Sequence, residues 1–152
     1  MNRTLRASLL FSAMAFLCGP LDALDQTENQ GPIDVKLCEV TAHSEKYNNK
    51  RLRIHASVES DGMHTTLLTD RKCATGILLY NSDEVEKSPE SHPDVQSLER
   101  AIEEGRAGTL NKRIEATFAG LFLMERAKGK SGRLMKLEAV TDLKVSSKKN
   151  AH

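Results

Sequence analysis

The chain has 152 residues, of which 22 are Lys or Arg, 21 are Asp or Glu and 39% are hydrophobic. This length allows one folded domain and not comfortably two. A formal net charge of +1 lacks the positive excess that is typical of a general nucleic-acid binder.

Residues 1–23 have the layout of a secretory signal peptide. Two arginines precede an uncharged, mostly apolar run at 7–17, and a Gly-Pro pair ends this run. The run is too short to span a bilayer, which takes about 20 apolar residues. We therefore predict cleavage after Ala23, a periplasmic or secreted location, and no transmembrane segment after cleavage. A buried core helix is the alternative for this stretch.

The three cysteines divide into one near the signal peptide's end and two beyond it. Cys18 gives a minor alternative, a lipid-anchored protein, although the large residues before it are atypical of lipoproteins. Cys38 and Cys73 remain, and an even number of cysteines in an exported chain suggests one disulfide. Two buried free thiols are the alternative. We predict no metal site and no cofactor, because no second pair of ligands has zinc spacing.

The first part of the predicted domain is a flexible leader followed by a short helix. Residues 24–33 are polar, with a Gly-Pro break. Asp34 is predicted to cap a helix that presents Leu37 and Val40 on one apolar face and ends by 42–44. The two asparagines before Lys50 then predict a turn, because Asn tolerates the left-handed conformation.

Three strands are predicted next. Residues 51–59 (RLRIHASVE) alternate without a fault between apolar and polar, which predicts a strand with one buried face. A tight turn at 60–62 predicts that the next strand, 64–70, pairs antiparallel with it. A second turn at 71–74 leads to a short apolar strand at 75–80.

A helix and two further strands complete the pattern. After a polar connection at 81–92, Ser91 is predicted to cap a helix with Pro93 in its first turn. A strand from about 113 contains Gly120, which marks a bend or bulge. A basic loop at 126–133 precedes a strand at 134–144, whose face changes near Ala139, as a bulge would produce.

These elements predict a mainly β (α+β) domain over 34–145 with a disordered tail at 146–152. Five strands, with one helix between the third and fourth and a short helix in front, have the order of the OB-fold, a small Greek-key barrel. The alternative is an open α+β sandwich whose helix covers one face of an antiparallel sheet. Pairing of the first strand with the fourth distinguishes the two.

The chain also resembles small exported bacterial proteins of unknown function. The resemblance is carried by Leu37-Cys38-Glu39, by the stretch 47–54 (YNNKRLRI) and by Cys73 ahead of an Ile-Leu-Leu-Tyr strand, and it covers about 34–145. One departure is Asn49, where the pattern has Gly. Those proteins look OB-like, so the resemblance implies fold and location and little about function.

The resemblance also implies a bridge between Cys38 and Cys73, because the same pair recurs in it. Such a bridge would tie the leading helix to the turn between the second and third strands. Closing a loop of about 36 residues is worth ~3–4 kcal/mol in the chain-entropy model.

The basic stretch is the best local signal for binding. Its cations, together with two arginines of the first strand, form a predicted ligand-binding set: Arg126, Lys128, Lys130, Arg133, Lys136, Arg51 and Arg53. In OB-folds the loop between the fourth and fifth strands helps to form the ligand face. A nucleic-acid partner is disfavoured, because there is no Trp and only two Tyr for stacking. A solvated hairpin tip is the alternative.

We expect no enzymatic activity, because no nucleophile, phosphate-loop or zinc-protease motif is present. The predicted function is an exported binding or accessory module of the cell envelope, whose partner is an anionic glycan or an envelope protein. The alternative is a protein–protein module with no small ligand, and a hydrolase ranks third. Binding gains support if Arg51, Arg53 and His55 lie beside the basic loop.

Overall fold

A computed structural model describes residues 31–61, 65–106, 112–127 and 130–147. The predicted signal peptide and most of the predicted leader lie outside these residues. The chain from Gly31 onward is one compact unit. No helix in the described part is long and apolar enough to cross a membrane.

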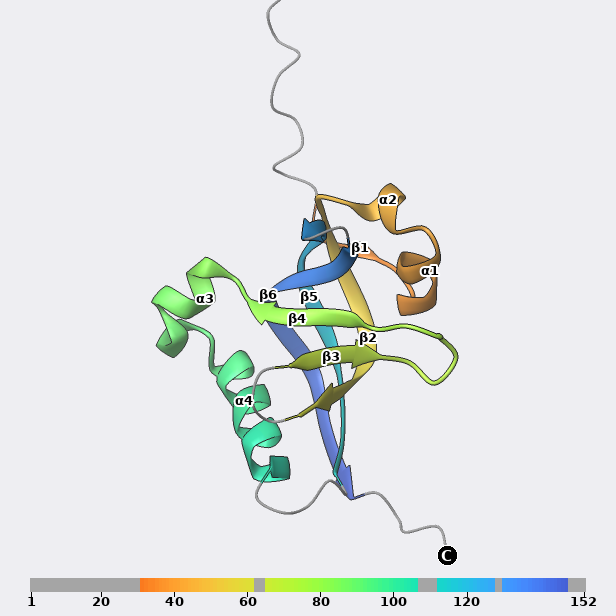
Figure 1. Cartoon of the computed structure of the whole chain (residues 1–152). Coiled ribbons are helices and arrows are strands. Elements are labelled where there is room, and N and C mark those ends of the chain that lie inside the picture. Colours follow the sequence, from red (N-terminus) through yellow and green to blue (C-terminus); the bar gives the residue numbers. More distant parts are fainter. Residues whose placement is uncertain (1–30, 62–64, 107–111, 128–129, 148–152) are drawn as a thin grey trace, which may run out of the picture. The chain divides into compact units, whose positions relative to one another are not determined.

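The protein is mainly β, with a six-stranded mixed sheet (Figure 1). The strands are β1 (Ile33–Asp34), β2 (Lys50–Ser60), β3 (Thr66–Thr69), β4 (Ile77–Asn81), β5 (Lys112–Ala127) and β6 (Lys130–Ser147). Their order is β1-β2-β3-β4-β6-β5, and β2 also pairs with β5, so the pairings return to β2. The β1–β2 and β4–β6 pairs are parallel and the others are antiparallel.

Helical segments occupy two of the connections. They are α1 (Leu37–Ala42) and α2 (Ser44–Tyr47) before β2, and α3 (Asp83–Lys87), the 3-10 turn η1 (Pro89–Ser91) and α4 (Pro93–Arg106) between β4 and β5. Figure 1 shows α1 and α2 together at one end and α3 and α4 on another side of the strands. The predicted apolar stripe of α4 is confirmed, because Val95 and Leu98 are buried in the core.

The alternation of β2 determines which of its side chains enter the core. Leu52, Ile54 and Ala56 are buried, whereas Arg51, Arg53 and the other residues between them are exposed. This confirms the predicted strand and its period of two. Opposite β2, Phe118 and Phe122 of β5 are fully buried, so the β2–β5 pair supplies a large part of the core.

Gly120 marks the predicted irregularity of β5. The register between β5 and β6 shifts at Ala119/Gly120, opposite Ala139 and Leu137. A Cβ on Gly120 would run into the backbone carbonyl of Lys136, so the two strands approach here more closely than any side chain permits. The predicted bend at Gly120 and the predicted bulge near Ala139 therefore correspond to one register shift, seen in β5 and in β6.

Some predicted boundaries are wrong. Asp34 lies in β1 and does not cap α1, whose preceding residue is Lys36. Ser91 belongs to η1, and α4 begins at Pro93. The expected basic loop at 126–133 is mostly strand, because β5 continues to Ala127 and β6 begins at Lys130. Strand pairing also continues to Ser147, into the segment expected to be a tail.

We predict that Gly120→Ala lowers the free energy of unfolding by at least about 2 kcal/mol, because the new methyl group must push the Lys136 backbone away. Gly132→Ala is the matched control, since a Cβ there meets nothing within 4 Å. It should change stability by no more than about 0.5 kcal/mol. Urea unfolding of both variants checks this, and equal stability of the two would contradict the close approach.

Candidate anion-binding pocket

The predicted ligand-binding residues do not form one patch. Lys128 lies outside the described residues, and of Arg126 and Lys130 only the backbone is described, paired with Ser131 and Ala127. Arg133 and Lys136 are three residues apart in the regular part of β6. Because side chains of a strand alternate, these two cations lie on opposite faces.

Three of the predicted cations share the outer face, and each has a carboxylate partner. Arg51 Nε lies 3.2 Å from Glu138 Oε1, and Lys136 Nζ lies 3.1 Å from Asp83 Oδ1. Arg53 Nη1 lies 3.5 Å from Asp34 Oδ2. Exposed pairs of this kind contribute little to stability, but they cancel the positive charge of the face.

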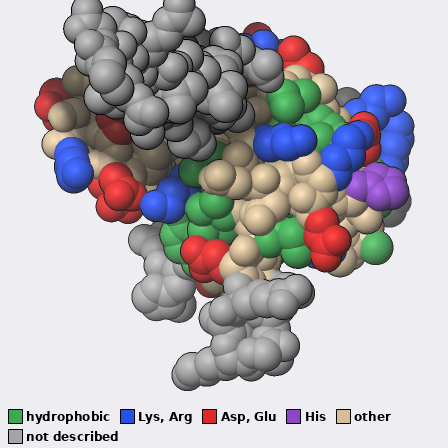
Figure 2. Space-filling view, turned by 90° about the horizontal axis from the view of Figure 1, so that it is seen from above, with side chains coloured by type: hydrophobic (Ala, Val, Ile, Leu, Met, Phe, Trp, Pro, Cys, Tyr) green, Lys and Arg blue, Asp and Glu red, His purple; other side chains and the backbone are tan. Residues whose placement is uncertain are grey.

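Charges of both signs are also interspersed elsewhere on the surface. In Figure 2, both Lys or Arg and Asp or Glu side chains are scattered over the visible face among the described residues. The outer face therefore resembles a solvated, charge-compensated surface more than a cationic binding site.

His55 also lies on this outer face, where it hydrogen-bonds to a threonine and not to the arginines or lysines of the described residues. Its Nδ1 lies 3.3 Å from Thr117 Oγ1, and the Thr117 hydroxyl donates at 3.2 Å to Asp142 Oδ2. Asp142 has a φ of 54°, a left-handed conformation inside β6. His55 is thus part of a polar row across three strands.

Arg133 has a different environment, in a pocket between α2 and the β5–β6 hairpin. Its Nε donates at 2.7 Å to the hydroxyl of Ser44, which is 7% exposed. No carboxylate of the described residues forms an ion pair with Arg133. Arg133 as a residue is half-buried and lines a cavity, and no hydrogen bond within the described ranges involves its two terminal nitrogens.

The cavity has a volume of about 410 Å³. Its lining comes from the α1–α2 junction and from the two strands of the hairpin, and consists of Thr41, Ala42, His43, Ser44, Glu45, Lys46, Met124, Gly132 and Arg133. Half-buried Arg side chains hold carboxylates, sulfates and phosphates well, because the planar fork donates two parallel hydrogen bonds.

Local hydrogen bonds fix the α1–α2 side of this pocket. The Ser44 hydroxyl also contacts the carbonyl of Val40 at 2.9 Å, which ties the start of α2 to the preceding helix. Asn48 Oδ1 accepts from the backbone N–H of Met124 at 2.8 Å. Asn49, with a φ of 59°, donates its backbone N–H to Phe122. The predicted left-handed turn is therefore held against β5 by these two hydrogen bonds.

Sequence reasoning found Arg133 and missed Ser44. In the sequence, Ser44 is a small polar residue where a helix was expected to end, and nothing local indicates that it is buried. Its partner lies 89 residues further along the chain, so the pair exists only because β6 returns beside α2.

A second polar cluster beside the pocket perturbs one carboxyl group. The Tyr47 hydroxyl donates to Glu39 Oε1, and Lys46 Nζ lies 3.2 Å from the same oxygen. Both contacts favour the charged form, and the Tyr47 bond is the main reason that the pKa of Glu39 is lowered. The stabilisation is present above the ordinary pKa of Glu and is lost as the pH falls through the lowered pKa.

We predict that Tyr47→Phe raises the pKa of Glu39 toward its ordinary value, because the ring stays in place and only the hydroxyl donor is removed. NMR titration of the Glu39 carboxyl carbon measures this. Thr41→Val is the control, since it removes a neighbouring hydroxyl that bonds to the Cys38 carbonyl instead. An unchanged pKa in Tyr47→Phe would show that Lys46 alone is responsible.

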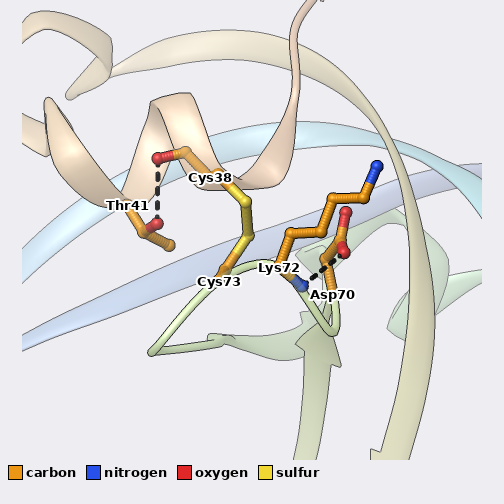
Figure 3. The surroundings of a disulfide bond; sticks show 5 residues. All are labelled: Cys38, Thr41, Asp70, Lys72 and Cys73. Atoms are coloured by element: carbon orange, nitrogen blue, oxygen red, sulfur yellow. Dashed lines mark hydrogen bonds between the residues drawn. A yellow bond between two sulfur atoms is a disulfide. The ribbon is translucent and has the colours of Figure 1, made fainter.

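The predicted disulfide is confirmed. Cys38 of α1 is bonded to Cys73 in the turn between β3 and β4, 35 residues away (Figure 3). The bridge fastens α1, and with it one wall of the pocket, to the other end of the β2–β3 hairpin. A cross-link over this separation contributes ~3–4 kcal/mol in the chain-entropy model.

A second cavity, of about 520 Å³, lies next to the disulfide. It is lined by the β3–β4 turn, the end of β2 and the start of β5. Its lining includes Arg71 and Arg113 as well as Glu59 and Asp70, so both signs of charge face it. Arg113 also forms an ion pair with Glu115. The Arg133 pocket also has one acidic lining residue, Glu45, so the two cavities differ in the Arg133–Ser44 contact and not in the signs of the charges that line them.

Comparison with models of known protein families, with curated proteins and with solved structures gives no match.

Proposed function

We propose that the protein is an exported binding module of the cell envelope, built on an OB-like barrel, that holds an anionic group in the Arg133 pocket. The observation that carries this proposal is the half-buried Arg133, which is held by Ser44 and has no carboxylate partner among the described residues.

The strand order supports an OB-like assignment. Five strands pair in the circuit β2-β3-β4-β6-β5 and back to β2, and α4 lies between the third and fourth of them. This is the order expected for a five-stranded Greek-key barrel. The open sandwich would lack the β2–β5 pairing. In the OB interpretation, Arg133 belongs to the hairpin that often contributes to the ligand face of such domains.

Two features support export. Residues 1–23 have a signal-peptide layout, and disulfides persist mainly in oxidising compartments. We predict that a bacterial host which exports the full chain yields a protein whose N-terminus is Leu24. Mass spectrometry of the periplasmic and membrane fractions tests this. An intact N-terminus there would contradict cleavage, and a lipid mass on Cys18 would favour the lipid-anchored alternative.

The chemistry of the pocket favours a small oxyanion, such as the carboxylate of a uronic acid or the sulfate of a glycan. The cationic fork would provide two hydrogen bonds, and the neighbouring Thr41, His43 and Lys46 would provide further polar contacts. A glycan fits the polar character of the lining better than a nucleic acid, which needs aromatic stacking surfaces.

We predict that Arg133→Gln weakens the binding of a uronic-acid or sulfated oligosaccharide at least about tenfold, since it removes a charge-assisted hydrogen bond worth about 1.5–3 kcal/mol. Arg100→Gln is the matched control, because Arg100 is an exposed cation of α4. Isothermal titration calorimetry at two salt concentrations measures both variants.

Equal losses in Arg133→Gln and Arg100→Gln would indicate diffuse charge attraction and contradict a pocket. No binding to the wild-type protein would favour the alternative, a protein–protein module. The observation that favours this alternative is Tyr80, an aromatic side chain of β4 that is 50% exposed.

A further inference from the structure

We propose that the reduced protein binds a zinc ion through Cys38, Cys73 and Asp70. One ligand atom from each of these residues lies within 4.8 Å of the other two, and all three residues are half-buried. Two thiolates and one carboxylate are a donor set that Zn²⁺ accepts, with water in the fourth tetrahedral position. This site is separate from the Arg133 pocket and belongs to the reduced chain, whereas the export proposed above leads to the disulfide-bonded chain.

The three ligands come from two elements that already face each other. Cys38 is the second residue of α1, and Asp70 and Cys73 begin and end the turn after β3 (Figure 3). The backbone N–H of Cys73 donates to the carbonyl of Asp70 at 2.9 Å, which keeps the turn closed. The first turn of α1 is closed in the same way, by the backbone N–H of Val40, which donates to the carbonyl of Lys36 at 3.2 Å.

A hydrogen bond from the backbone also orients the carboxylate. The N–H of Lys72 donates at 2.9 Å to Asp70 Oδ1. No hydrogen bond of the described residues involves Oδ2, which is therefore free to ligate. Bonds of this type to one oxygen of a ligating carboxylate position the other oxygen at the metal.

The disulfide and the zinc site are mutually exclusive states of the same cysteine pair. In the oxidised protein the sulfurs are bonded to each other, so neither is a thiolate. Reduction by a trialkylphosphine transfers two electrons to the sulfur–sulfur bond, and water supplies the phosphine oxide's oxygen and both thiol protons. Zn²⁺ then displaces two protons as it binds.

The required movement is small. Two thiolates at ~2.3 Å from a tetrahedral zinc lie about 3.8 Å apart. The Cα atoms of the two cysteines are 5.1 Å apart, so side-chain rotation can open the sulfurs to this distance. Bound zinc would then keep α1 attached to the β3–β4 turn after the covalent bond is lost.

The test uses the full chain with Cys18→Ser, which leaves Cys38 and Cys73 as the remaining cysteines. Phosphine-reduced and oxidised samples are titrated with Zn²⁺ against a chromogenic chelator and with Co²⁺, whose thiolate charge-transfer band reports sulfur ligation. We expect one ion per reduced chain and none per oxidised chain. Asp70→Asn should weaken Zn²⁺ binding at least tenfold, whereas the exposed Asp83→Asn should not change it.

Three results would overturn the proposal. They are equal affinity in Asp70→Asn and Asp83→Asn, absence of the charge-transfer band, and binding of Zn²⁺ only to a chain whose circular dichroism shows loss of β structure. Slower reoxidation of the thiols in the presence of Zn²⁺, in the parent chain and not in Asp70→Asn, is the second expected readout.

Discussion

The pairing of β2 with β5 is the constraint on which the rest of the structure depends. It runs through nine consecutive residue pairs, from Lys50 with Phe122 to Val58 with Ile114. This register puts the buried side of β2 against the buried phenylalanines of β5 and leaves both arginines of β2 outside. It also brings β6 beside α2, because β5 and β6 form one hairpin, and thereby creates the Arg133 pocket.

The alternation of side chains along a strand explains why a basic stretch of sequence does not form a basic patch on the surface. Arg133 and Lys136 of β6 lie on different faces. On the outer face, Lys136 pairs with Asp83 of α3, and Glu138 of β6 pairs with Arg51 of β2. Arg133 differs from the other cations because it lies on the face of β6 that contacts the buried Ser44. The number of charges around it is not what distinguishes it. A single half-buried cation is thus a more specific indication of an anion-binding site than the number of cations in a stretch of sequence.

The elements that could be predicted from the sequence are those determined by local pattern. Alternation located β2, the spacing of Val95 and Leu98 located α4, and the mid-strand Gly120 located the bulge. Asp34 was assigned wrongly because a short stretch of sequence does not distinguish a helix-capping residue from a residue of an edge strand. Its place in the edge strand depends on pairing with β2. The Ser44–Arg133 contact could not be found locally, since it joins residues 89 positions apart and depends on the complete strand order.

The position of the disulfide along the chain has a consequence for the order of assembly. Both cysteines precede residue 74, so the loop that the bridge closes contains nearly all of α1, the whole of α2 and the whole β2–β3 hairpin, while β5 begins at Lys112. Because a chain is synthesised from its N-terminus, this segment is complete before β5, and its disulfide can form first under oxidising conditions. Until β5 is in place, the nine residues of β2 that later pair with β5 form an open strand edge, the type of surface that recruits other chains.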